Sequence, residues 1–100
     1  MSSSDRLPAY AGLPGHELVV QGVDDLDAGR ETAPALLVAM ASARLRETGV
    51  RVPDTAFEAP SHRLYDLLAR AEPDDAHARY NALVRRLVSF ARAAEHAAPR

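Results

Sequence analysis

The segment 35–41, Ala-Leu-Leu-Val-Ala-Met-Ala, is apolar at every position and constrains the fold more than any other feature. Thr32 before it is a good N-cap residue, Pro34 is tolerated in a first helical turn, and Gly49 can end a helix in the left-handed conformation. These signals predict a helix over about residues 33–48. Because a helix without a polar face must be surrounded, we expect the other helices or a second copy of the chain to cover it.

Residues 74–97 show the spacing of one long amphipathic helix, which Asp74 would cap. Residues on its predicted inner side recur at three- and four-residue steps: His77, Tyr80, Val84, Leu87, Ala91 and Ala94, widened by Leu83, Val88 and Phe90. Its predicted outer side has Arg85 and Arg92 along one border and Arg79 and Arg86 along the other, with small residues between them: Ala78, Ala82, Ser89 and Ala93.

Two shorter helices are predicted. The first covers about residues 16–28, because Val19, Val23 and Leu26 form a stripe and Gly29 can stop the helix. Gly22 within it costs about 1 kcal/mol relative to Ala; if it faces inward, it permits the close approach of a neighbouring helix.

The other short helix covers about residues 62–71, with Ser61 as its expected cap. Pro60 and Tyr65 are placed as a hydrophobic staple, and Asp66 faces Arg70 at four-residue spacing. The connection over residues 49–60 is irregular, and a short strand there stays open.

These elements predict an all-α, single compact domain of about four helices in an orthogonal or irregular bundle. A chain of 100 residues buries only about two-thirds of its unfolded surface, which allows one modest core. We expect a flexible N-terminal arm over 1–13, a helical domain over 14–97 and a C-terminal tail over 98–100.

The chain has no cysteine, which excludes a disulfide framework, thiolate zinc ligands and a cysteine nucleophile. The longest apolar run, residues 33–41, is about half the length that spans a bilayer. We therefore expect a cytoplasmic protein with no membrane segment.

Histidines are the groups that titrate near neutral pH without help. His62 and Asp66 share a helix face, and His77 approaches them if the last two helices pack antiparallel. No metal-ligand signature supports a site there, and the alternative is that His62 lies at the surface and His77 is half-buried with a local hydrogen bond. Asn81 beside Tyr80 is read as packing plus a hydrogen bond. We expect no metal, no cofactor and no enzyme activity, because no nucleophile turn or phosphate loop is present either.

An acidic cluster, Asp24, Asp25 and Asp27, falls at the C-terminal end of the first helix, where the helix dipole disfavours anions. Partners within the fold, such as Arg30, are the first interpretation. Binding of a divalent cation is the second, although the spacing is not that of an EF-hand loop.

All twelve basic residues are Arg, and the net charge is −2, which disfavours nucleic acid as a partner. Arg79 has Asp75 four residues before it as a pairing partner, whereas Arg85, Arg86 and Arg92 lack a well-placed local acid. The candidate partner-binding residues are therefore Arg85, Arg86, Arg92, Ala82 and Ser89.

Three interpretations of this face stay open: a solvated surface, a docking face for a protein partner or a second copy, and contact with nucleic-acid phosphate. We expect a small helical protein interaction module, whose partner is another protein or a second copy of the chain. The alternative is a nucleic-acid-binding accessory protein that uses the arginine face of the long helix.

The stretches 35–41 and 78–87, Ala-Arg-Tyr-Asn-Ala-Leu-Val-Arg-Arg-Leu, resemble those of small uncharacterised helical proteins of high-GC actinobacteria. Such families carry no activity that could be transferred to this chain, so the resemblance implies a bacterial source and no site residue.

Overall fold

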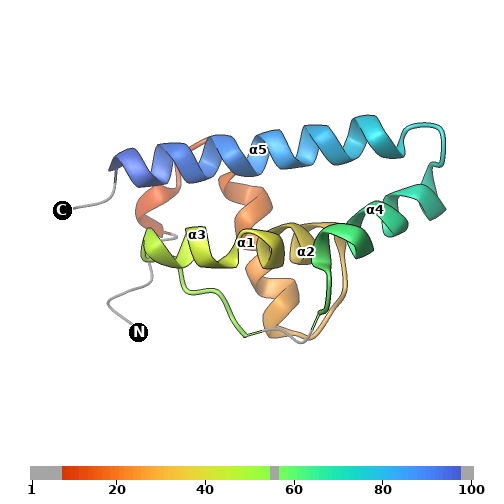
Figure 1. The fold of residues 1–100 in the computed structure, drawn as a ribbon. Coiled ribbons are helices and arrows are strands. Elements are labelled where there is room, and N and C mark those ends of the chain that lie inside the picture. Colours follow the sequence, from red (N-terminus) through yellow and green to blue (C-terminus); the bar gives the residue numbers. More distant parts are fainter. Residues whose placement is uncertain (1–7, 55–56, 98–100) are drawn as a thin grey trace.

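The structure, a computed structural model, describes residues 8–54 and 57–97. In these ranges all elements of regular secondary structure are helices (Figure 1). The elements are η1 (Pro8–Tyr10), α1 (His16–Asp27), α2 (Ala33–Met40), α3 (Ser42–Glu47), α4 (Pro60–Ala71) and α5 (Ala76–Ala97). In Figure 1, α5 runs along one side of the molecule and the other helices lie beneath it. The prediction of an all-α single domain is confirmed.

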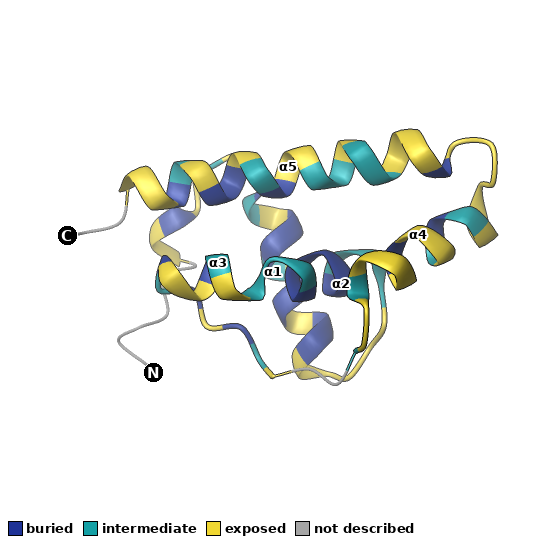
Figure 2. Cartoon of the chain, viewed as in Figure 1, coloured by how far each residue is buried: buried dark blue, intermediate teal, exposed yellow. Residues whose placement is uncertain are grey.

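Helix α2 lies at the centre of the core, as its apolar sequence predicts. Its residues from Ala35 to Ala39 are all buried, and Leu36, Leu37 and Val38 have no exposed surface. It packs against α1, α4 and α5 (Figure 2). The other helices of the same chain therefore enclose α2, and no second copy is needed to cover it.

The contact between α1 and α2 depends on Gly22. A Cβ atom built on Gly22 would lie 2.4 Å from the carbonyl oxygen of Pro34 and 2.4 Å from Cγ2 of Val38. Real Cβ atoms do not approach other atoms so closely, so any larger residue would push the two helices apart. The expectation that an inward Gly22 permits a close helix contact is confirmed.

Local signals correctly place the end of α1. Gly29 has a φ of 73°, and the N–H of Arg30 donates to the carbonyl of Asp25 at 2.8 Å. This hydrogen bond, between residues five apart, is one of the two that define a Schellman motif. The next helix begins where Thr32 caps it, because its hydroxyl accepts a hydrogen bond from the Ala35 N–H at 3.2 Å.

The predicted helix over 33–48 is wrong in one respect, because it is divided at Ala41. Ala41 has a φ of −104° and a ψ of 16°, and its N–H donates to the carbonyl of Val38 in a tighter turn. No glycine or proline stands at the break. Beyond it, α3 buries Leu45 in the core. The division therefore reflects tertiary packing and not a local breaker.

Two predicted caps are also wrong. Helix α4 begins at Pro60, after Ala59 in the left-handed conformation, so Ser61 lies within the first turn and makes no cap bond. Helix α5 begins at Ala76, and the carbonyl of Asp75 accepts the Arg79 N–H, one residue later than the cap expected at Asp74.

The connection after α3 is extended but unpaired. No strand occurs in its described residues, and residues 55–56 lie outside the description. Val50 and Val52 are buried, and the Tyr10 hydroxyl donates to the carbonyl of Thr48 at 2.8 Å. Tyr10 is only 3% exposed, so this residue of the segment predicted to be an arm packs on the core, whereas Pro8 and Ala9 are exposed. Residues 1–7 and 98–100 lie outside the described part.

Candidate interaction surface

The acidic cluster in the last turn of α1 includes a carboxylate that links two helices. Asp25 is only 3% exposed, and its carboxylate accepts hydrogen bonds from the Gln21 amide at 3.0 Å, the Arg30 guanidinium at 3.0 Å and the Thr32 hydroxyl at 2.6 Å. The Thr32 hydroxyl, followed by the Arg30 guanidinium, holds the pKa of Asp25 below its usual value. One carboxylate thus ties the end of α1 to the start of α2, which supports the expectation of a partner within the fold.

Seven arginines of the described chain pair with an acid, and in four of these pairs the acid lies far away in the sequence. Arg44 of α3 makes a two-bond contact with Glu95 of α5, and Arg63 of α4 makes one with Glu31, at distances from 2.6 to 3.0 Å. These contacts lower the pKa of each glutamate. Ion pairs therefore join helices, and they account for most of the positive charge.

The predicted pairing of the α5 arginines is only partly right. Arg79 pairs with Glu72 and not with Asp75. Arg86 was expected to be unpaired, but its guanidinium donates to Glu17 of α1 at 2.6 Å. Glu17 is 69 residues away in the chain, so no local spacing could reveal it.

Arg85 is left without an opposite charge. It is exposed, and none of the hydrogen bonds or ion pairs of the described residues involves it. Arg92 is also exposed but lies in the field of Glu95, whose pKa is lowered by Arg44 and, to a smaller extent, by Arg92. Arg70 is similarly close enough to Glu31 to lower its pKa. Arg85 is thus the described arginine with no acid beside it.

The surface beside Arg85 combines small and half-buried apolar residues. Ala82 and Ser89 are exposed, as the helical spacing predicts. Val84 and Val88 lie further inward, four residues apart, and each is only partly buried. We name this set of five residues on α5, Ala82, Val84, Arg85, Val88 and Ser89, the Arg85 face. It offers apolar contact next to an unneutralised cation.

The histidine constellation does not form a metal centre. The described residues contain no group of three His or acidic side chains that could hold a metal ion. His77, expected to be half-buried, is exposed, and its ring lies 3.2 Å from the Asn81 amide in the predicted kind of local contact. His62 is exposed, as predicted.

A hollow between α4 and α5 was not predicted from the sequence. It has a volume of about 350 Å³ and is lined by Ser61, His62, Tyr65 and Tyr80. The two tyrosine rings lie 5.8 Å apart, tilted by 57°, and Tyr65 is 39% exposed, the one exposed large apolar side chain of the described chain. The four polar groups have no hydrogen-bond partner among the described residues. We name this feature the tyrosine hollow.

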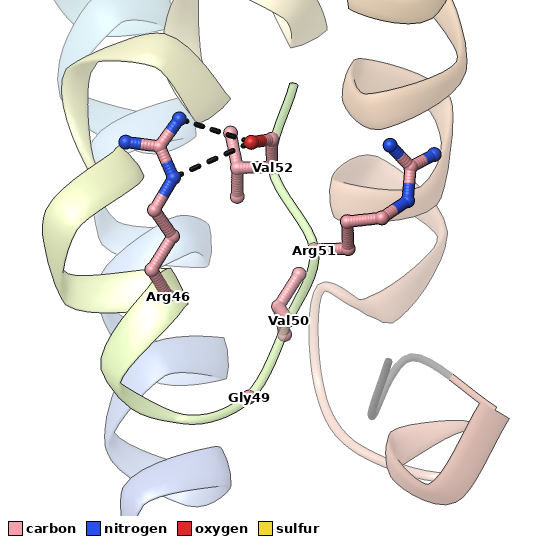
Figure 3. Close-up of a pocket in the computed structure, with 5 residues that line it drawn as sticks. All are labelled: Arg46, Gly49, Val50, Arg51 and Val52. Carbon is pink, nitrogen blue, oxygen red and sulfur yellow. Dashed lines mark hydrogen bonds between the residues drawn. The ribbon is translucent and has the colours of Figure 1, made fainter. Parts of the chain in front are cut away.

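A second hollow, of about 260 Å³, lies along the extended segment after α3. Figure 3 shows Arg46 and Arg51 on opposite sides of that segment. The Arg46 guanidinium donates to the carbonyl of Val52 at 2.9 and 3.3 Å, and Arg51 pairs with Asp27 at 2.9 Å. Both arginines have partners within the protein. Their contacts hold the connection against α3 and α1.

Comparison with known proteins yields no relative: no family model, no curated protein and no solved structure matches the chain. The resemblance to small actinobacterial helical proteins stays a prediction. None of the helices in the described ranges combines the length and the apolar character needed to cross a bilayer.

Proposed function

We propose that this chain is a small helical protein interaction module that docks a protein partner through the Arg85 face. The observation that carries the proposal is the isolation of Arg85. Seven arginines of the described chain have a carboxylate partner, and two more lie near one, whereas Arg85 has none. Arginine is enriched at interfaces and among the residues that contribute most to binding.

The composition of the Arg85 face supports docking to a protein. Arginine is enriched in interface hot spots. Ala82 and Ser89 flank Arg85 without side chains long enough to hold a partner away. The row Val84 and Val88 still has apolar surface to bury. The partner segment should therefore present an acidic or aromatic group to Arg85 and apolar side chains to this row.

Nucleic acid fits this surface less well. Phosphate binding needs several free cations along one face, because each neutralised phosphate contributes to affinity. Here Glu72 neutralises Arg79 and Glu17 neutralises Arg86, which leaves two cations, Arg85 and Arg92, on this face. Docking without turnover in the cytoplasm is the matching proposal for activity and location. The chain has no cysteine, and its described residues contain no group of three His or acidic side chains that could hold a metal ion.

A charge reversal tests the proposal. Arg85→Glu should weaken capture of a protein partner, or self-association, by about tenfold or more, because central interface arginines contribute about 2 kcal/mol or more. Arg70→Glu is the matched control, since Arg70 is also exposed on a helix and changes the net charge equally. The measurement is sedimentation velocity of the purified protein together with capture by immobilised protein.

A strictly monomeric protein whose captured partners are the same for wild type and Arg85→Glu contradicts the proposal. A gel shift that fades as salt rises and is lost in Arg85→Glu would instead favour the nucleic-acid alternative.

A further inference from the structure

The outer side of α5 places Arg85 in line with two small residues. At about 100° per residue, Ala78, Ala82 and Arg85 lie within about 60° of one another around the helix, and all three are exposed. The buried residues Leu87 and Ala94 lie on the opposite side of α5, which faces the other helices (Figure 1). This outer side is therefore open to a partner.

An unpaired acid begins the same side of the helix. The Arg79 N–H donates to the Asp75 carbonyl at 2.9 Å, so the Cα atom of Asp75 continues the track of α5 one residue before Ala76, about 20° from Ala82 around the axis. Asp75 and the neighbouring Asp74 are exposed, and neither forms an ion pair in the described part of the molecule. We name Asp75, Ala78, Ala82 and Arg85 the outer strip; it has an unpaired acid at one end and an unpaired arginine at the other.

The spacing of the outer strip is self-complementary. Position 80 is the midpoint of Asp75 and Arg85, which lie about 15 Å apart along the axis, and also of Ala78 and Ala82, which lie about 6 Å apart. Two antiparallel copies of α5 that cross at this level place Arg85 of each copy opposite Asp75 of the other. The same crossing places Ala78 opposite Ala82, and these small side chains let the two helix axes approach closely. One two-fold axis generates all of these contacts, as in an isologous interface.

We infer that the partner that Arg85 binds is a second copy of this chain, held through the outer strip in an antiparallel dimer. This inference rests on the proposed function and names its partner. The occupant follows from charge complementarity, because the outer strip presents its own acid where a second copy presents its arginine. Within one described monomer Arg85 and Asp75 do not pair, since they stand at opposite ends of the strip. The contact uses one helix of each copy, so it belongs to the small interfaces of transient complexes.

The test uses two variants that each reverse one side of the contact. Arg85→Glu opposes a carboxylate to the aspartates of the second copy, whereas the double variant Asp74→Arg with Asp75→Arg opposes two guanidinium groups to its Arg85. Exchange of an exposed ion pair for a like-charge contact weakens association by about fivefold, and the two-fold axis repeats the exchange. Each variant alone should therefore dimerise about 25-fold more weakly than wild type in sedimentation velocity over a concentration series at low salt.

A mixture of the two variants restores both contacts. In the mixed dimer the glutamate introduced at position 85 faces the introduced arginines, and the native Arg85 of the double variant faces native aspartates. Fluorescently labelled Arg85→Glu should therefore bind the unlabelled double variant as tightly as wild type dimerises. Labelled Arg70→Glu is the matched control, because it has the same net charge but meets the double variant with one attractive and one repulsive contact, so it should bind about fivefold more weakly. Circular dichroism checks that all variants are folded.

The outcomes separate this inference from the proposed function. A mixture that associates no more tightly than either variant alone overturns the inference. Equal binding of Arg85→Glu and Arg70→Glu to the double variant also overturns it, because net charge alone would then account for the association. A wild type that stays monomeric, or a dimer that both reversals leave unchanged, overturns the inference as well. In those cases the proposed function depends on whether Arg85→Glu abolishes capture of a different protein.

Discussion

Replacement of Gly22 by alanine should destabilise the protein, although the same change in most helices does the opposite. A helix-interior Gly→Ala substitution ordinarily stabilises by about 1 kcal/mol. In α1, however, the added methyl group would meet the Pro34 carbonyl oxygen and Cγ2 of Val38, each at 2.4 Å. Val38 could change its rotamer, but the carbonyl belongs to the first turn of α2 and can move only with that helix.

The size of the effect follows from these two terms. Overpacking a core costs about 1–3 kcal/mol, and a backbone obstacle places this site near the upper end. Subtracting the gain of about 1 kcal/mol in helix propensity leaves a net loss of about 2 kcal/mol. For a domain of this size, that loss lowers Tm by about 8–16 °C.

Thermal unfolding followed by circular dichroism at a helix-sensitive wavelength measures this difference. Gly12→Ala is the matched control, because it makes the same chemical change where no atom lies within 4 Å of the added Cβ. Its Tm should stay within a few degrees of the wild-type value. A Gly22→Ala variant that unfolds at or above the wild-type temperature would refute the close contact between α1 and α2.

The remaining predictions concern other parts of the core. Tyr10→Phe should lower the free energy of unfolding by about 1 kcal/mol, because it removes the buried hydrogen bond to the Thr48 carbonyl. Leu36→Ala should lower it by about 3 kcal/mol, because it opens a cavity in a fully buried site. Chemical denaturation measures both, and an unchanged midpoint in either variant would count against the described core. The Thr32 hydroxyl lowers the pKa of Asp25, so this carboxylate stabilises the fold fully above its unfolded-state pKa of 3.8 and progressively less as pH falls through the lower folded-state pKa. Tm measured against pH should therefore decline below about pH 4, less steeply in Asp25→Asn than in wild type, and parallel declines would contradict the role of Asp25.

Elements with strong local signals could be predicted from the sequence. Thr32 and Gly29 were correctly placed as helix start and stop, because capping depends on residues within one turn. The enclosure of α2 also followed from its sequence, since an apolar helix has no surface suited to water.

Features that depend on distant residues could not be predicted. The break at Ala41 has no breaker residue and arises only when α3 packs on the core. The pairing of Arg86 with Glu17 joins residues 69 apart. The tyrosine hollow needs α4 and α5 side by side, and spacing within one helix does not show which side chains of the other it meets.

Fewer arginines remain as candidates for binding a partner than the sequence suggested. The spacing of α5 selected three free arginines, and the folded chain neutralises Arg86 and places Arg92 near Glu95. Arg85 keeps its isolation because no acid of another helix reaches it. Long-range ion pairs, which the sequence does not show, decide which cations remain for a partner.

Isotope-filtered NMR on a mixture of labelled and unlabelled protein tests the docking role of Arg85 most directly. Under conditions in which sedimentation shows association, we predict intermolecular contacts that involve the Arg85 side chain. Intermolecular contacts that involve other surfaces, with none from Arg85, would contradict the account.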